Sequence, residues 1–132
     1  MMNIMKSIKI MGGNLVGNID ERLSIIAKAC SDKMGLDIKV LNLKGLTVIA
    51  DYFIIASGNS TTQVKAITDE VEKKMVEAGF YPRNKEGHRS SKWVLLDFGD
   101  IVAHIFHREE REFYNLEKLW ADGEEMILDG NL

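Results

Sequence analysis

The sequence predicts an α/β protein, with an α+β-like mixed sheet flanked by helices, for three reasons. The chain has 132 residues, enough to bury one ordinary hydrophobic core. Its composition, 45% hydrophobic and 28% charged residues, is typical of a globular domain. Apolar residues follow a helical period in some segments and a period of two in others, in the order α-β-β-α-β-β-β-α.

The first expected element is an amphipathic helix that begins near Asp20 and ends at Gly35. Its apolar side chains recur at i, i+3, i+4, i+7 and i+11, the spacing of one buried helix face. They are Leu23, Ile26, Ala27, Cys30 and Met34. Because Cys30 belongs to this face, we expect it to pack in the core and not to act as a catalytic thiol.

Two strands and a second helix are expected next. The first strand lies at 38–40, and the second occupies the apolar run 46–56, where Asp51 is the only charge. A run this apolar indicates a strand covered on both faces. The helix begins after Gly58-Asn59-Ser60, since Ser60 and Gln63 have capping-box spacing. Its predicted buried stripe is Val64, Ile67, Val71, Met75 and Ala78.

A third group of strands precedes the last helix. We expect a short strand at 80–81 before Pro82, a polar loop over 83–91, and a hairpin of strands 93–98 and 101–106 joined by Gly99-Asp100. A final helix is expected from Glu109. Its apolar stripe would be Phe113, Leu116 and Trp120.

Charge and glycine content divide the chain into three parts. Residues 1–18 contain three glycines and no helical stripe, so they are interpreted as a flexible N-terminal arm. The domain spans 19–122, and 123–132 form an acidic C-terminal tail. Residues 109–132 carry a net charge of −6, whereas 83–92 hold four basic residues and one acidic residue. This layout suits a protein partner with charged patches. The total charge of −3 argues against nonspecific polyanion binding, and little direct nucleic-acid contact is expected.

Several classes of protein are excluded by simple counts. No apolar run approaches the roughly 20 residues of a membrane span, and the N-terminus lacks the apolar centre of a secretory signal. The single cysteine excludes an internal disulfide and a thiolate zinc cluster. The expected compartment is the cytoplasm.

Enzyme chemistry has one candidate position, the Gly58-Asn59-Ser60 turn. A helix N-terminus after such a turn can cradle phosphate, and nucleotidyltransferases use it in this way. They also need paired carboxylates for metal ions. The nearest pair is Asp97 and Asp100, whose spacing of three across a turn does not place both on one face. A nucleotidyltransferase-like enzyme or nucleotide-binding protein is therefore the alternative, with no catalytic residue predicted.

The histidines do not suggest a metal site. His88 lies alone in a loop, and His104 and His107 are three apart on a strand, which directs them to opposite faces. A zinc site needs three or four convergent ligands, so no metal ligand is predicted.

One face of the predicted hairpin has a mixed composition. Trp93, Leu95 and Asp97 share it with residues of the next strand, which are Val102, His104 and Phe106. Aromatic residues beside acids are typical of an interface hot spot. Alternatively, the final helix covers this face and Trp93 is ordinary core. The sequence pattern does not distinguish between an exposed interface and a face covered by the final helix.

Three motifs resemble one known family. They are ADYFIIASGNS at 50–60, WVLLDFGDIVAH at 93–104 and YNLEKLW at 114–120. In this order and spacing they are similar to the ribosomal silencing factor family, also called RsfS or Iojap. The resemblance runs from about residue 19 to 122.

The resemblance implies a nucleotidyltransferase-like core without catalytic carboxylates, no enzymatic activity and no cofactor. It implies binding to the large ribosomal subunit through its L-fourteen-type protein. The bound factor would keep the small subunit from docking and repress translation when nutrients are limiting. Carried over by position, the partner-binding residues are Trp93, Asp97, Asp100 and Tyr114, with Leu95, His104 and Phe106 as neighbours.

Two details complete this expectation. Trp93 and Phe106 would anchor the contact, while Asp97 and Asp100 would meet basic residues of the partner. The loop 85–88 would border the same surface. Family members also form dimers, so the aromatic face could instead pair two copies of the chain.

Overall fold

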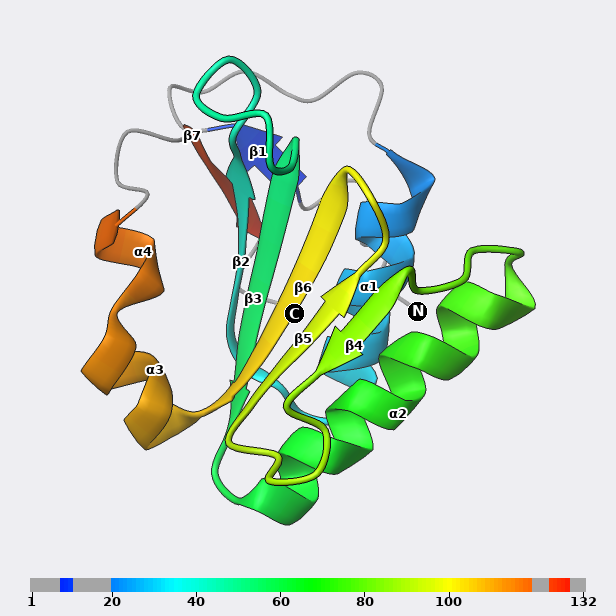
Figure 1. The fold of residues 1–132 in the computed structure, drawn as a ribbon, viewed down its shortest axis with the longest axis vertical. Helices are drawn as coiled ribbons and strands as arrows, with labels where there is room; N and C mark the ends of the chain where they lie inside the picture. Colours follow the sequence, from blue (N-terminus) through cyan, green and yellow to red (C-terminus); the bar gives the residue numbers. More distant parts are fainter. Residues whose placement is uncertain (1–7, 11–19, 120–123, 129–132) are drawn as a thin grey trace.

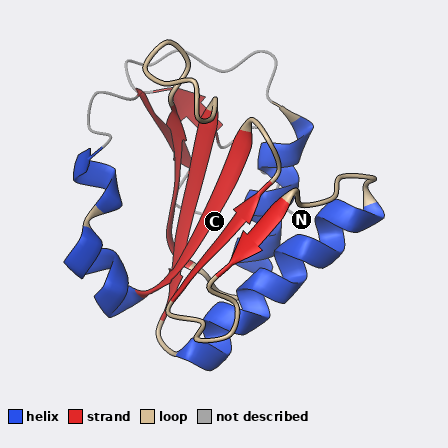
Figure 2. Ribbon diagram, in the orientation of Figure 1, coloured by secondary structure: helices blue, strands red, loops and turns tan. Residues whose placement is uncertain are grey.

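Seven strands form one mixed sheet in the computed structural model, which describes residues 8–10, 20–119 and 124–128 (Figures 1 and 2). The strand order is β1-β7-β2-β3-β6-β5-β4. Among the strands of the described residues, only β3 and β6 pair in parallel. The strands are β1 (Ile8–Ile10), β2 (Leu36–Asn42), β3 (Tyr52–Gly58), β4 (Asn84–Glu86), β5 (Trp93–Asp97), β6 (Ile101–His107) and β7 (Glu124–Leu128). The mixed α/β fold predicted from the sequence is confirmed.

Two long helices cover one face of the sheet: α1 (Glu21–Asp32) and α2 (Thr61–Glu77). Both predicted stripes are buried as far as the helices extend, and Cys30 packs among them. Burial raises the pKa of the Cys30 thiol to about 12, which keeps it protonated and inert. Each predicted stripe includes one residue too many, because Met34 and Ala78 lie beyond the helix ends and are exposed.

The capping box predicted at the start of α2 is present. The Ser60 side chain accepts a hydrogen bond from the Gln63 amide at 3.0 Å, and the Gln63 side chain accepts one from the Asn59 amide at 2.7 Å. The first bond satisfies a donor that a helix start leaves unpaired, and the second pairs the amide of the residue that precedes the N-cap Ser60.

Two short helices, α3 (Arg108–Tyr114) and α4 (Leu116–Leu119), lie against the other face. The second core there consists of Leu41, Leu43, Ala50, Phe53, Ile55, Val102, Phe106 and Leu116. The predicted single last helix is split because Asn115 adopts a left-handed conformation, with φ 47° and ψ 54°. Phe113, assigned to the buried stripe, is 80% exposed, and Trp120 lies outside the described residues.

The strand predictions were wrong in two places. The apolar run from Leu46 enters β3 only at Tyr52, and Val48 and Ile49 are exposed in the preceding loop. The strand expected at 80–81 is absent from this described segment, because the Phe80 amide bonds back to Met75 at the end of α2. The short edge strand is instead β4, inside the predicted loop, and it pairs with β5.

Parts of the expected arm and tail belong to the sheet. Strand β7 pairs with β2, and β1 pairs with β7. Without β7 the edge of β2 would leave a row of backbone groups unpaired, which explains why the chain returns to it. The expectations that residues 1–18 are a flexible arm and 123–132 a tail outside the domain are therefore wrong for Ile8–Ile10 and Glu124–Leu128. The other residues of both segments lie outside the described residues.

Within the described part of the chain, no helix has both the length and the apolar composition required to cross a membrane.

Gly87, in the turn between β4 and β5, cannot accept a side chain. Its φ is +79°, and an added Cβ would lie 1.9 Å from the backbone oxygen of Trp93. We expect Gly87→Ala to lower the free energy of unfolding by about 2 kcal/mol or more, measured by urea denaturation. Gly45→Ala is the matched control, since Gly45 has φ +83° with nothing within 4 Å of the added Cβ. Equal effects of the two substitutions would contradict the predicted clash.

Candidate functional site

The mixed face of the hairpin predicted from the sequence is present in β5 and β6. The register places Trp93 opposite Phe106, Leu95 opposite His104 and Asp97 opposite Val102, all on the face that carries α3. The Trp93 ring stacks on Phe106 at 4.8 Å and contacts Tyr114 at 4.9 Å, both between ring centroids. The structure therefore brings Trp93, His104, Phe106 and Tyr114 into one cluster.

Exposure divides this cluster into a floor and a surface. Phe106 and His104 are buried, whereas Trp93 and Leu95 are half-buried and Tyr114 is 51% exposed. Phe113 contacts Tyr114 edge-on at 5.1 Å and adds a further exposed ring. We call Trp93, Phe113 and Tyr114 the aromatic surface. Phe106, expected as an anchor, lies beneath it and supports Trp93 from inside the core.

A hydrogen bond fixes the orientation of the Trp93 ring. Its Nε1 donates to Nδ1 of His104 at 3.1 Å. This bond requires an unprotonated Nδ1, and burial lowers the pKa of His104 to about 4, so the imidazole is neutral at physiological pH. The ring of Phe53 contacts His104 edge-on at 4.5 Å and closes the floor. The indole is therefore held in place before any partner binds.

The two acids expected in the site lie away from the aromatic surface. Trp93 begins β5 and Asp97 ends it, and four steps along a strand span about 13 Å. The Asp97 carboxylate accepts a bond from the Gly99 amide at 2.7 Å, which stabilises the hairpin turn. Asp100 accepts two bonds from Arg22, at 2.6 and 3.0 Å, and this pairing lowers its pKa. Neither acid belongs to the aromatic cluster.

The Gly58-Asn59-Ser60 turn is separated from both acids by the length of the sheet. Gly58 pairs with His107 at one end of β6, whereas Asp97 pairs with Val102 near the other end. Five steps along a strand are about 17 Å. The Gln63 side chain also occupies the turn, where it donates to the carbonyl oxygens of Lys33 and Met34. This geometry does not bring carboxylates to a phosphate bound at the turn.

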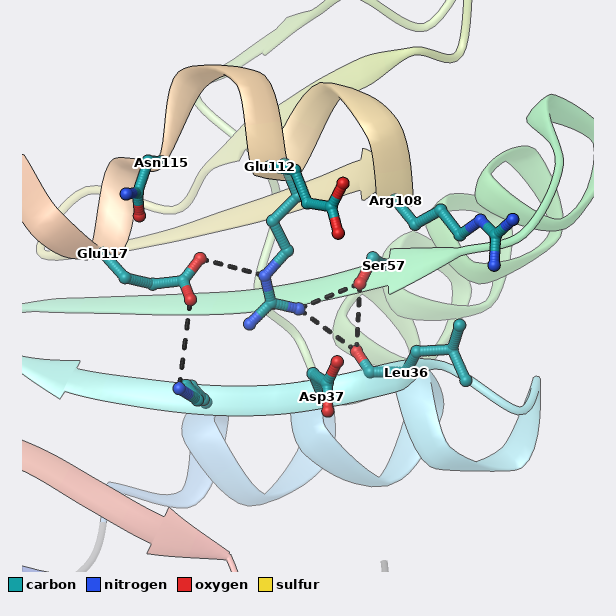
Figure 3. Close-up of a pocket in the computed structure, with 9 residues that line it drawn as sticks. Leu36, Asp37, Ser57, Arg108, Glu112, Asn115 and Glu117 are labelled. Atoms are coloured by element: carbon teal, nitrogen blue, oxygen red, sulfur yellow. Dashed lines mark hydrogen bonds and ion pairs between the residues drawn. The ribbon is translucent and has the colours of Figure 1, made fainter.

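Helix α3 buries a single residue, and that residue is charged. Arg111 donates from Nε to Glu117 of α4 at 2.9 Å, and from Nη1 to the Ser57 hydroxyl of β3 at 2.9 Å and the Leu36 carbonyl of β2 at 3.2 Å (Figure 3). The Leu36 carbonyl lies beside a register shift in β2, where Asp37 has φ 47°. Arg111 thus joins three elements to α3.

A polar pocket of about 610 Å³ opens next to this arginine. Its lining is charge-balanced, with three basic and three acidic side chains. These are Lys39, Arg108, Arg111, Asp37, Glu112 and Glu117. The sequence reasoning missed Arg111. The sequence did contain one indication of its role. Arg111 lies three residues before Tyr114, in a helix too short to bury an apolar stripe.

Comparison with known proteins identifies the family. A family model described as "Ribosomal silencing factor during starvation" matches residues 17–131. The chain belongs to the ribosomal silencing factor family. It is 47% identical over 107 residues to ribosomal silencing factor RsfS of Bacillus subtilis, a match covering 81% of this chain and 91% of the relative. The family match also continues beyond residue 122, over the segment that forms β7.

One more distant relative and one solved structure agree with this assignment. The present chain is 38% identical over 88 residues to mouse "Mitochondrial assembly of ribosomal large subunit protein 1". The match covers 64% of this chain and 39% of that protein. A crystal structure of a Chromobacterium violaceum protein superposes with a TM-score of 0.76 at 38% identity, covering 79% of this chain and 87% of that one. The mixed sheet with its helices is therefore the architecture of a structurally characterised relative.

The buried neutral His104 makes stability depend on pH. Its folded pKa of about 4 lies below the ordinary 6.5, so the unfolded chain binds the proton more readily. We expect the contribution of neutral His104 to the free energy of unfolding to be fully present above about pH 6.5. It should fall by about 3 kcal/mol as the pH approaches 4. Urea denaturation across this range tests the dependence. His104→Gln, which keeps an acceptor and cannot titrate, should flatten it, and an unchanged slope in that variant would exclude His104 as the cause.

Loss of Arg111 should release α3 from the sheet. We expect Arg111→Ala to lower the free energy of unfolding by about 2 kcal/mol, because it removes a buried charged donor and leaves Glu117 without its closest partner. Thermal or urea unfolding measures the effect. Arg108→Ala, an exposed arginine on the same helix, is the control and should change stability by less than about 0.5 kcal/mol. Equal effects at both positions would contradict the anchoring role.

Proposed function

We propose that this protein binds the large ribosomal subunit through its L-fourteen-type protein and sterically blocks joining of the small subunit. Translation would thereby be repressed when nutrients are limiting. The observation that carries the proposal is the aromatic surface, in which a half-buried, hydrogen-bonded tryptophan and two exposed rings lie over a buried floor. The family assignment and the large-subunit protein named among its relatives support a ribosomal partner.

The aromatic surface has the composition of a protein-binding hot spot. Trp93 is half-buried and hydrogen-bonded, so it loses little conformational freedom on binding, and Tyr114 and Phe113 offer apolar area around it. Truncation of such a central aromatic residue typically costs about 2 kcal/mol or more in binding. Leu95 extends the surface along β5 toward Asp97.

The acids play a secondary part in this proposal. Asp97 and Asp100 lie at the far end of the same strands, where Asp100 is already paired with Arg22. A basic residue of the partner would have to share that carboxylate. We therefore propose that Asp97 and Asp100 set the orientation and the association rate of the complex more than its strength.

Silencing by occupancy needs no reaction. A bound protein that fills the subunit interface opposes joining as long as it remains bound, so the equilibrium constant and dissociation rate determine the effect. We propose that the protein is not an enzyme, needs no cofactor and works in the cytoplasm, where its ribosomal partner is found. The strand–turn–helix at Gly58–Ser60 supports descent from a nucleotidyltransferase-like core, and the separation of that turn from Asp97 and Asp100 accounts for a loss of activity.

The exposed rings could also bind a second copy of the chain. Phe113 and Tyr114 would then be shared between a homodimer and the ribosomal complex, and the two states would exclude each other. In that case dimer formation lowers the concentration of free binding surface. Sedimentation over a concentration range would detect it.

Substitutions in the aromatic surface test the proposal. We expect Tyr114→Ala and Trp93→Ala each to weaken binding to the isolated L-fourteen-type protein at least about thirtyfold. The measurement is a binding titration, with circular dichroism to confirm the fold. Val48→Ala is the control, because Val48 is fully exposed in the loop before β3 and lies outside the aromatic surface. Wild-type affinity in both aromatic variants would show that the partner binds elsewhere.

A further inference from the structure

A basic pocket lies between α2 and the turn that connects β4 to β5. Its volume is about 270 Å³, and Figure 1 shows this turn beside the N-terminal half of α2. The lining residues are Lys65, Thr68, Asp69, Lys85, His88, Arg89, Ser91 and Val94.

The pocket carries an excess of positive charge. Lys65 and Arg89 form no hydrogen bond or ion pair with any of the described residues, whereas Lys85 pairs with Glu72 at 3.1 Å. Asp69 is the only acidic side chain in the lining. Two basic groups that line a small cavity and have no partner among the described residues suit a phosphate oxyanion, whose negative charge they can both contact.

The turn that presents Arg89 is rigid. The Ser91 amide donates to the Gly87 carbonyl at 3.0 Å, and the Ser91 hydroxyl donates to the His88 carbonyl at 3.0 Å. Ser91 is buried with a φ of 56°, and Gly87 has no room for a side chain. Strained backbone of this kind is maintained at binding sites more often than elsewhere, and it orders the turn before a ligand arrives.

The pocket and the aromatic surface lie on opposite faces of the sheet and meet at the start of β5. Ser91 and Lys92 lead directly into Trp93, whose side chain belongs to that surface, while Val94 faces α2 and the pocket. Arg89 is four residues from Trp93, at most about 14 Å along the chain, and β4 does not extend past Leu95 of β5. A partner that covers Trp93 and reaches around the start of β5 can therefore present a charged group to Arg89 at the same time. The proposed ribosomal partner displays protein and RNA side by side, and RNA supplies a phosphate at every nucleotide.

We propose that the basic pocket binds a backbone phosphate of ribosomal RNA beside the protein that the aromatic surface contacts. This inference rests on the proposed function and identifies a second component of the partner. The contact is limited to one or two phosphates and carries no base specificity. It is compatible with the net charge of −3, because the positive charge is local.

The test compares two double variants with equal changes in charge. Lys65→Gln with Arg89→Gln removes the unpaired basic groups. Lys28→Gln with Lys74→Gln is the control, since these lysines line a separate groove between α1 and α2. Affinity for whole large subunits is measured between 50 and 200 mM salt, and affinity for the isolated L-fourteen-type protein in parallel.

The pocket variant should bind whole subunits several-fold more weakly at low salt. The slope of log affinity against log salt should be smaller by about one to two, because each phosphate contact contributes about 0.7 to 0.9. Affinity for the isolated protein should not change. A slope equal to that of the control variant would overturn the inference. Equal weakening toward the isolated protein would also overturn it, and would assign the pocket to an acidic protein patch.

A second measurement separates this inference from the proposed function. A short single-stranded RNA oligonucleotide is titrated into the free protein and followed by NMR. Shifts at Lys65, Arg89 and Ser91 that disappear in the pocket variant support a phosphate site even if large subunits fail to bind, in which case only the proposed function fails. No shifts at these residues, with unchanged subunit binding in the variant, would exclude the phosphate site.

Discussion

The arrangement of the aromatic surface depends on one buried arginine. Helix α3 has seven residues and buries only Arg111, so the helix is attached to the sheet by hydrogen bonds instead of an apolar stripe. Those bonds have directions, which an apolar contact does not, and they reach β2, β3 and α4. Tyr114 lies one helical turn further along. The contact between Tyr114 and Trp93 therefore depends on the position of Arg111.

The two faces of the sheet serve different purposes. The face under α1 and α2 is a closed apolar core with fully buried side chains from both helices and four strands. The other face is only partly covered, and its floor includes a neutral histidine that orients the indole above it. A closed core supplies stability, and the partly covered face leaves aromatic rings accessible at the surface. This division fits a binding protein better than an enzyme, whose reactive groups would converge in a pocket.

Local patterns explain which elements the sequence predicted correctly. The stripes of α1 and α2, the Ser60–Gln63 capping box and the faces of β5 and β6 all depend on residues within a few positions of one another. Strands β1 and β7 depend on pairing between opposite ends of the chain, and β4 depends on β5 as a neighbour, so no local pattern indicated them. Strands β1, β4 and β7 therefore form because of tertiary pairing and not because of local sequence.

The candidate site was predicted only in part, because local patterns show which residues share a face but not what packs over them. Alternation along the hairpin identified Trp93, Leu95, His104 and Phe106 as one face, but it could not distinguish floor from surface. That distinction depends on where α3 packs, which is determined by Arg111 and by the break at Asn115. Phe113 was assigned to the core because a continuous helix was assumed. The family resemblance added Tyr114, which no strand pattern could have placed beside Trp93.

The most direct test of the central claim is a subunit-joining measurement by sedimentation at near-physiological salt. Purified large subunits are incubated with the protein, small subunits are added, and the fractions are examined for the protein and for joined ribosomes. The proposed mechanism predicts that the protein sediments with large subunits and that joined ribosomes decrease as its concentration rises. Joined ribosomes that still carry the protein, or protein that remains at the top of the gradient, would contradict it.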